Sequence, residues 1–438
     1  MEQLPPDRTA RHRVALPGSP WSMVLRFGLV SLAVDAVSDG ARPLAGPLLA
    51  QLGASALLVG LVTGGAEAAA QGLRLVFGPW ADRTGKYWTF TLAGYALTAL
   101  CIPLLAVTPA LGTAGLVLAS VLIIGDRVGK AVRSPAKTVL LADVAVAVGR
   151  GRGFAVHKAL DLAGAFSGPL IASAVIVATG ALWPAFAVLA VPGAFAMALL
   201  FWMRRRIPEP HGPRAAQDVL EAQGAAGSSG PAATPRERLS AVFVLFAVSA
   251  FFWSAGLVAF GVIAFHLTAA VEVPVPAVPL VYAAAMAAAA LGALASGYAY
   301  DRAGGAVLLV LPFLVTLVPV LAFSAGMGPV LAGVLVWGAA TGIQDSTVKA
   351  LVADLVVPAR QGTAYGIFAA FEGAGALAGG ALYGALYGSP PALIAAVAVL
   401  QGVALVLLIA TVVRSHRRRA PGAAPGAAPE PARAPEPE

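Results

Sequence analysis

The chain has 438 residues, of which 59% are hydrophobic and 11% are charged, whereas about 25% of the residues in a soluble domain are charged. This composition excludes an ordinary soluble fold and indicates a protein whose main solvent is lipid. The net charge of +8 does not indicate nucleic-acid binding, because the basic residues stand at the ends of apolar segments. The single cysteine, Cys101, lies inside an apolar segment, so neither a disulfide nor a multi-cysteine metal site is expected.

Apolar segments long enough to cross a bilayer follow one another along most of the chain. A helix needs about 20 apolar residues to cross, and a strand in hydrocarbon would leave its backbone groups unpaired. We therefore predict an all-α membrane protein with twelve spans, at roughly 21–49, 56–79, 87–107, 112–142, 152–178, 182–203, 239–268, 275–299, 306–324, 329–356, 361–386 and 391–413.

Every second connection between these spans carries Lys or Arg. The alternate connections contain neither residue, and they lie near 51–55, 108–111, 179–181, 269–274, 325–328 and 387–390. Lys and Arg are enriched in cytoplasmic loops of membrane proteins. We therefore expect both termini to be cytoplasmic, in a protein of the cytoplasmic (inner) membrane.

The longest break in the apolar pattern is rich in Pro, Gly, Ser and Ala, which predicts a flexible linker. This break divides the spans into two pseudo-symmetric groups of six. The predicted regions are an N-terminal tail at 1–20, a six-helix lobe at 21–206, the linker at 207–238, a second six-helix lobe at 239–413 and a disordered tail at 414–438.

A polar phrase of the form Gly-x-x-x-Asp-Arg-x-Gly occurs twice. The first copy runs from Gly78 to Gly85, and the second runs from Gly297 to Gly304, 219 residues later in the chain of 438. Each copy ends an apolar run, so both are expected to be polar loops. Their separation by half the chain predicts two homologous halves.

A second duplication supports the same division. Its first copy comprises Ala142, Asp143, Gly151, Asp161, Gly164 and Gly168, and its second copy has, at the same spacings, Ala353, Asp354, Gly362, Glu372, Gly375 and Gly379. The two copies cover the fourth and fifth predicted spans of each lobe.

Two six-span lobes, a central linker and the repeated phrase resemble the major facilitator superfamily over essentially the whole chain between the tails. The matching residues of the signature loop are Gly78, Asp82, Arg83, Gly85 and Lys86, and those of its weaker repeat are Gly297, Asp301, Arg302 and Gly304. The resemblance implies transport by alternating access. It also implies a cytoplasmic gate in which Asp82 contacts the start of span eleven, near Gly362.

The fifth span contains Gly164, Gly168 and Pro169 in a Gly-x-x-x-Gly-Pro pattern. This pattern resembles the core of a motif found in bacterial drug:proton antiporters, although Ala172 and Ser173 stand where that motif has two glycines. The alternative is that the small residues only allow helices to approach closely.

The fourth span is unusually rich in charge. Asp126, Lys130, Arg133 and Lys137 follow the spacing i, i+4, i+7, i+11, which places them on one face. Exposing this charged face to lipid would be energetically costly, so the face is expected to line an interior cavity. Arg127 is turned by about 100° and is expected at a helix contact.

The resemblance implies that an arginine of this span takes part in proton coupling, and Arg127, Lys130 and Arg133 all remain candidates. Counting the rise of about 1.5 Å per residue from the ends of their helices puts Arg133 and Asp161 at similar depth. We predict that these two form an ion pair, directly or through Lys130.

Further ionisable and aromatic side chains are expected at bilayer depth. The proton-coupling candidates are Asp35, Glu67, Asp161 and Glu372, and further cavity candidates are Asp39, Trp253, Gln344, Tyr365 and Phe371. The alternative for the acids is that they neutralise the cations of span four and hold the first lobe together.

The sequence predicts a proton-coupled exporter of a small organic molecule, acting as a monomer in the lipid bilayer. No catalytic arrangement, phosphate-binding glycine loop or histidine spacing for a metal is found, so no enzyme activity, cofactor or metal is expected. Two alternatives stay open. One is uptake of an anionic solute bound by Lys130, Arg133 and Lys137, and the other is a non-transporting membrane receptor or scaffold.

Overall fold

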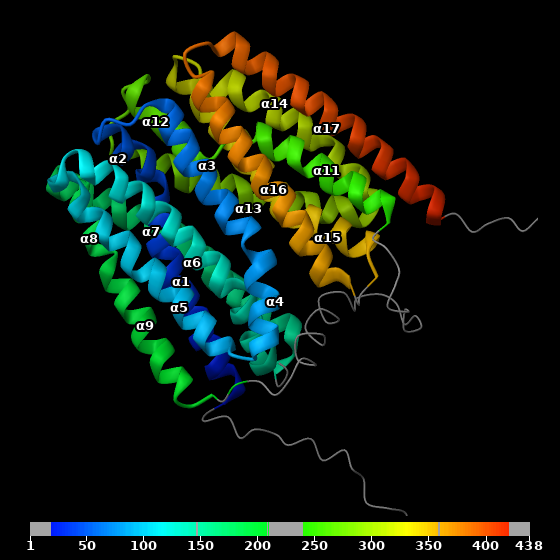
Figure 1. The fold of residues 1–438 in the computed structure, drawn as a ribbon, viewed down its shortest axis with the longest axis horizontal. Helices are drawn as coiled ribbons and strands as arrows, with labels where there is room; N and C mark the ends of the chain where they lie inside the picture. The colour runs from blue at the N-terminus through cyan, green and yellow to red at the C-terminus, as the bar shows by residue number, and fades with distance from the viewer. Residues whose placement is uncertain (1–18, 146–147, 208, 210–239, 358–359, 420–438) are drawn as a thin grey trace, which may run out of the picture.

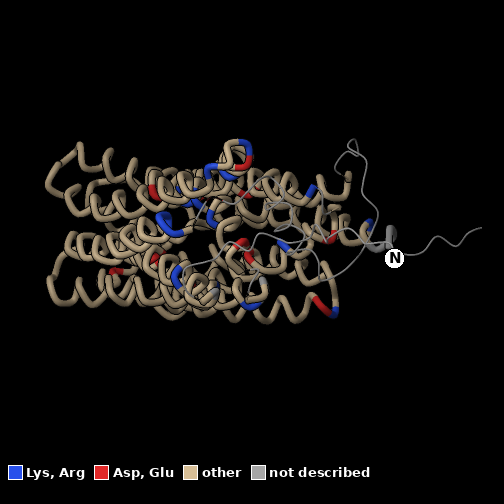
Figure 2. The backbone as a smooth tube through the Cα atoms, turned by 90° about the horizontal axis from the view of Figure 1, so that it is seen from below, with Lys and Arg blue, Asp and Glu red and all other residues tan. Residues whose placement is uncertain are grey.

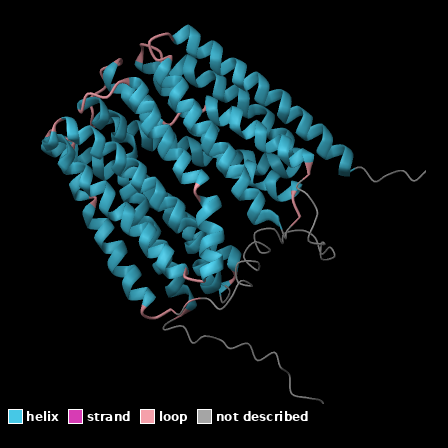
Figure 3. Cartoon of the chain, in the orientation of Figure 1, coloured by secondary structure: helices cyan, strands magenta, loops and turns pink. Residues whose placement is uncertain are grey.

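The structure, a computed structural model, describes residues 19–145, 148–207, 209, 240–357 and 360–419. The regular structure of these residues is helical throughout (Figure 3). Most of the predicted tails and linker lies outside them. The elements, with η for 3-10 helices, are α1 (Pro20–Ala41), η1 (Arg42–Leu44), α2 (Ala45–Gln51), α3 (Ala56–Gly72), α4 (Arg74–Thr84), α5 (Tyr87–Leu104), η2 (Leu105–Leu111), α6 (Thr113–Ala145), α7 (Arg150–Thr179), α8 (Trp183–Val188), α9 (Ala190–Arg204), α11 (Ala241–Gly256), α12 (Phe260–Ala269), α13 (Ala277–Ala303), η4 (Gly304–Val310), α14 (Leu311–Ala322), α15 (Met327–Leu355), α16 (Gln361–Ala385) and α17 (Pro390–Arg419).

By length and composition, 10 helical segments of the described chain could cross a membrane. The segment Ala277–Ala322 joins α13 to α14 and therefore holds two of the predicted spans. Helix α6 does not qualify, because each 18-residue stretch of it carries more than two charged residues. The all-helical fold with twelve spans is consistent with this arrangement.

The helices of the two halves of the chain lie side by side. Figure 1 shows α1–α9 on one side and most of α11–α17 on the other, while α12 packs on α2 and α3. We call the end that holds the start of α1 and the end of α17 the termini end. The opposite end, with the connections at 52–55 and 270–276, is called the loop end.

The two halves meet most closely toward the loop end. A Cβ atom added to Gly60 of α3 would lie 2.1 Å from the carbonyl oxygen of Gly380 of α16, so the two backbones touch. Nearby, the Ser173 hydroxyl donates to the carbonyl oxygen of Pro276 at 2.7 Å. At the termini end, α4 and α15 end apart (Figure 1).

The glycines of the second duplication make the same contacts in each half. They bring α7 against α1 in the first half and α16 against α11 in the second. An added Cβ would lie between 2.2 and 2.5 Å from the facing carbonyl oxygen in the pairs Gly164–Leu32, Gly168–Ala36, Gly375–Phe251 and Gly379–Ala255. Any side chain at these positions would push the helices apart.

The repeated phrase is helical over most of its length, so the expectation of two polar loops is wrong. Helix α4 continues through Asp82 and α13 continues through Asp301. Only the last glycine of each copy leaves its helix, with φ of 64° at Gly85 and 58° at Gly304. These left-handed conformations end a helix readily where no Cβ is present.

Candidate functional site

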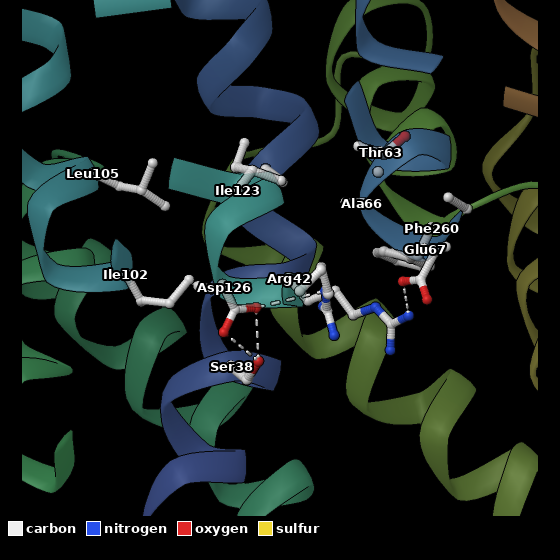
Figure 4. Close-up of a pocket in the computed structure, with 15 residues that line it drawn as sticks. Ser38, Arg42, Thr63, Ala66, Glu67, Ile102, Leu105, Ile123, Asp126 and Phe260 are labelled. Atoms are coloured by element: carbon white, nitrogen blue, oxygen red, sulfur yellow. Dashed lines mark hydrogen bonds and ion pairs between the residues drawn. The ribbon is translucent and has the colours of Figure 1, made fainter. Parts of the chain in front are cut away.

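A small cavity lies where α1, α3, α5 and α6 meet α12 of the second half (Figure 4). Its volume of about 40 Å³ is enough for water molecules or a small chemical group. Polar side chains come from Ser38, Arg42, Thr63, Glu67, Asp126 and Arg127, and the apolar wall includes Ile102, Leu105, Ile123 and Phe260.

An ion pair and a tyrosine connect three helices beside this cavity. Arg42 pairs with Glu67 of α3, and its Nη1 lies 3.7 Å from Oδ1 of Asp39. The fully buried Tyr282 of α13 donates to the same Asp39 oxygen at 3.0 Å. Asp39 is therefore next to the cavity, as predicted, and it is held from both halves.

On the opposite side of the cavity, α6 supplies adjacent opposite charges. The Ser38 hydroxyl contacts both Asp126 oxygens at 3.0 and 3.2 Å, and Arg127 Nε lies 3.5 Å from Asp126 Oδ2. Arg127 lines the cavity rather than a helix contact, so that expectation is wrong. Although its Cα is turned by about 100°, its long stem carries the guanidinium back beside the carboxylate.

Lys130 lies one turn further along α6. Among the described residues, its ammonium group makes neither a hydrogen bond nor an ion pair within 4 Å. Lys130 is thus available to this site without being committed to a protein partner.

A second group of charges gathers around Asp161 on α7, nearer the termini end. We call Ser31, Asp35, Lys137, His157, Lys158 and Asp161 the α7 cluster. An Asp161 oxygen lies 3.9 Å from Lys137 Nζ, 3.6 Å from His157 Nε2 and 3.5 Å from Lys158 Nζ. The Asp35 carboxyl group of α1 interacts electrostatically with Asp161.

Ser31 connects the members of this cluster on α1, α6 and α7. Its hydroxyl accepts from Lys137 Nζ at 3.0 Å and lies 3.2 Å from His157 Nε2. The serine thus bridges two of the three basic groups that lie near Asp161.

The predicted Arg133–Asp161 pair is wrong. Arg133 donates to Thr98 at 2.7 Å, and its guanidinium lies 4.9 Å from the centre of the Tyr95 ring. Helix α5 approaches α6 so closely that a Cβ on Gly94 would lie 2.6 Å from Arg133 Cβ. Arg133 therefore packs against α5, and Lys137 faces Asp161 instead.

The candidates of the second half are not brought to the cavity. Gln344 donates to Glu372 at 2.8 Å, and Tyr365 donates to the carbonyl oxygen of Lys349. Trp253 is fully buried and packs on Phe residues of α11 and α16, while Phe371 packs on the main core. The second half instead contributes Phe260 and Tyr282.

Sequence reasoning did not propose several residues of these sites, namely Ser31, Ser38, Arg42, Thr63, His157, Phe260 and Tyr282. A signal existed for His157, which precedes Asp161 by four residues and so shares its helix face. Tyr282 is one of several aromatic residues of the second half that could line a pocket, but the sequence does not single it out. Phe260 had no signal, because its position depends on how α12 meets the first half. No three His, Cys, Asp or Glu side chains of the described chain group as metal ligands.

At the termini end, the expected contact between Asp82 and the start of α16 is not made by the described residues. The Asp82 carboxylate instead accepts from the Tyr87 hydroxyl at 3.2 Å, within its own half. In the second copy, Arg302 stacks 3.7 Å from the centre of the Tyr298 ring. With the halves apart at this end, neither copy reaches across.

Comparison with known proteins identifies the family. A family model described as Major Facilitator Superfamily matches residues 27–325 and 242–435. Uncharacterised proteins of Mycobacterium tuberculosis (strain ATCC 25618 / H37Rv) and Mycobacterium bovis (strain ATCC BAA-935 / AF2122/97) are 47% identical over 399 residues, covering 90% of this chain and 93% of each relative.

Solved structures of transporters share the fold. A point variant of the nucleoside transporter NupG superposes with a TM-score of 0.68 at 14% identity, covering 89% of this chain and 99% of that one. A POT family transporter in complex with a thioalcohol conjugated peptide gives 0.67 at 12% identity, covering 91% and 97%. At these identities the likeness concerns the fold alone. Together with the family model, it shows that the chain is a multi-pass membrane protein of the Major Facilitator Superfamily.

Proposed function

We propose that the protein is a secondary active transporter that exports a small organic molecule in exchange for protons, as a monomer working by alternating access. The observation that carries this proposal is the α7 cluster. Ionisable groups within a membrane-spanning segment are costly to bury and mark proton or substrate pathways by default. In this cluster, the Asp161 carboxylate lies within 4 Å of the His157 imidazole and of the Lys137 ammonium group of α6, and Lys137 also donates to Ser31 of α1.

The electrostatic interaction of Asp35 with Asp161 supports proton binding at this place. Two neighbouring carboxylates repel each other, so binding of a proton to one of them is favoured. Gaining or losing that proton changes the charge that faces Lys137 of α6. Because Asp35, Asp161 and Lys137 lie on different helices, the change alters the attraction between α1, α6 and α7.

The proposal includes a direction and a conformational state. Basic residues are nearly missing from the loop end and gather over the middle and the termini end (Figure 2). By the enrichment of cytoplasmic loops in Lys and Arg, the termini end is cytoplasmic and the membrane is the cytoplasmic membrane. With the halves in contact at the loop end, the conformation described here is open toward the cytoplasm.

Vesicle transport tests the proposal. Inverted membrane vesicles that carry a pH-sensitive dye in the lumen would be given candidate solutes, with and without an imposed pH gradient. We expect solute uptake into the lumen to require the gradient and to release lumenal protons. Solute flux that ignores the gradient would contradict proton coupling, and proton and solute movement in the same direction would favour symport.

Uptake of an anionic solute is the second candidate, favoured by the unpartnered Nη1 of Arg127 and by the neighbouring cation Lys130. The same vesicles distinguish it from export by the direction of net movement. A non-transporting receptor would show neither flux, whereas alternating access requires opening and closing that respond to solute. Cysteine-labelling rates at the two ends measure that response.

A further inference from the structure

The acidic groups around the cavity all have hydrogen-bond donors. Tyr282 donates to Asp39 at 3.0 Å, Arg42 donates to Glu67, and Ser38 donates to Asp126. Each of these carboxylates therefore already accepts a hydrogen bond from the protein. A ligand that offers only donors, such as an ammonium group, would have to displace one of these contacts.

The basic groups are in the opposite situation. Arg127 is 5% exposed, and its Nη1 is buried without a hydrogen-bond partner among the described residues. The Nε atom of Arg127 is 3.5 Å from Asp126, which is too long for a good hydrogen bond. The neighbouring Lys130 makes no hydrogen bond and no ion pair within 4 Å among the described residues either.

A buried donor without an acceptor is expensive, and a charged one more so. The group in the cavity that lacks a partner is thus a hydrogen-bond donor, the guanidinium of Arg127, and Lys130 follows it by one turn of α6 outside the lining residues. The group that completes the site must be an acceptor, and an anionic one gives the strongest pairing.

We propose that this cavity binds the oxyanion group of a small organic anion, a carboxylate by preference, through Arg127 and Lys130. A guanidinium presents two parallel N–H donors that match the two oxygens of such a group. The cavity, with a volume of about 40 Å³, has room for a small polar group. Ile102, Leu105 and Phe260 form an apolar wall beside it. The proposal rests on the proposed function for the claim that this ligand is the transported one.

Equilibrium binding to the full-length protein in detergent tests the site without any gradient. Benzoate, benzamide, benzylamine and phenyl phosphate would be compared at constant ionic strength, by calorimetry and by the shift in thermal unfolding. We expect benzoate to bind and to raise the unfolding midpoint, while benzamide and benzylamine do neither. Tighter binding of phenyl phosphate that also needs Arg127 would support an oxyanion site and assign it to phosphate.

Variants connect this binding to the named residues. Arg127→Gln should weaken benzoate binding by about tenfold or more, because charge-assisted hydrogen bonds are lost. Arg127→Lys keeps the charge and guards against misfolding, and it should weaken binding by less. The matched control is Arg204→Gln, an exposed residue at the end of α9, which should leave binding unchanged.

Three results would overturn the inference. They are equal binding of benzoate and benzamide, no oxyanion-dependent shift for any probe, or full benzoate binding by both Arg127 variants. None of them bears on proton coupling, which the vesicle experiment measures separately. Conversely, benzoate could bind as proposed to a protein whose transport ignores the pH gradient, and only the proposed function would then fail.

Discussion

The two halves of the molecule share a backbone arrangement but differ in the charges placed on it. In each half, two glycines bring the fifth predicted span against the first, with nearly the same approach of Cβ positions to carbonyl oxygens. Asp161 and Glu372 stand at matching places on α7 and α16, 211 residues apart. Asp161 lies near three basic groups and a second carboxyl group, whereas Glu372 accepts a hydrogen bond from the neutral Gln344.

The same correspondence explains why one predicted ion pair failed. Gln344 lies 211 residues after Arg133, so the Gln344–Glu372 contact is the counterpart of the expected Arg133–Asp161 pair. The contact between the fourth and fifth spans that was predicted from helix rise therefore exists in the second half. In the first half this contact is missing, because Arg133 instead donates to Thr98 and stacks on Tyr95, both of α5. The comparison suggests that the first half titrates and that the second half serves as its fixed counterpart.

The largest effect is expected from removing the charge of Asp161. Asp161→Asn leaves Lys137 and Lys158 without their shared carboxylate, and breaking a buried pair costs about 3–5 kcal/mol. We expect gradient-driven transport in vesicles to fall by about tenfold or more. Glu372→Gln is the matched variant in the second half and should reduce transport much less.

Equal losses in Asp161→Asn and Glu372→Gln would remove the functional difference between the halves. Thermal unfolding of both variants serves as the control for folding. A loss of transport that simply tracks a lower unfolding midpoint would assign Asp161 to the scaffold, which is the alternative reading of the acidic residues.

The glycine contacts should respond alike in both halves, because the backbone arrangement is shared. An alanine at Gly168 or Gly379 would place Cβ 2.2 or 2.5 Å from a facing carbonyl oxygen. Overpacking of this kind typically costs about 1–3 kcal/mol. We expect Gly168→Ala and Gly379→Ala to lower the unfolding midpoint in detergent by similar amounts.

Gly402→Ala on α17 is the control, because nothing lies within 4 Å of its added Cβ and helix propensity favours the alanine. A strong effect at only one of the two contact glycines would show that the halves pack differently in the membrane.

Each half also contains a buried histidine, and smaller effects are expected from replacing these two residues. His266 uses both ring nitrogens, with Nδ1 2.9 Å from the Tyr387 hydroxyl and Nε2 3.1 Å from the carbonyl oxygen of Ser324. Since a carbonyl only accepts, Nε2 donates to Ser324, and both ring nitrogens have a hydrogen-bond partner. His157 has its Nδ1 buried without a partner among the described residues and its Nε2 near Asp161.

We therefore expect His266→Gln to act on stability and His157→Gln to act on coupling. Loss of the His266 hydrogen bonds should lower the free energy of unfolding by about 1–2 kcal/mol, with the pH profile of transport unchanged. His157→Gln should shift that pH profile with little change in unfolding. A shifted pH profile in His266→Gln, together with a loss of stability alone in His157→Gln, would contradict the roles proposed for the two halves.

The sequence predicted the features that depend on local spacing and composition. The spans, the interior location of the charged face of α6 and the duplicated glycine contacts follow from helix periodicity and from small residues at fixed intervals. The partners of the charged residues could not be predicted in this way. The Arg127 side chain points into the cavity, and the Arg133 side chain points away from α7. These directions depend on the rotation of α6 and on the close approach of α5, which the sequence does not reveal.

The smallest effects are expected at the two copies of the repeated phrase, and they test which copy is the principal gate. Asp82 accepts a hydrogen bond from Tyr87, while Asp301 is exposed and makes none among the described residues. Asp82→Asn should therefore cost about 0.5–1 kcal/mol of stability, and Asp301→Asn should stay within about 0.5 kcal/mol.

If the Asp82 copy forms the latch when the termini end closes, Asp82→Asn should also slow transport, and Asp301→Asn should slow it less. The measurement is the rate of solute flux together with labelling of cysteines at the termini end, which reports closing. Tyr87→Phe isolates the hydrogen bond seen here, because it leaves the Asp82 charge in place. A Tyr87→Phe variant that transports normally beside a slow Asp82→Asn variant would mean that the carboxylate acts when the termini end closes, through a contact that the structure described here does not contain.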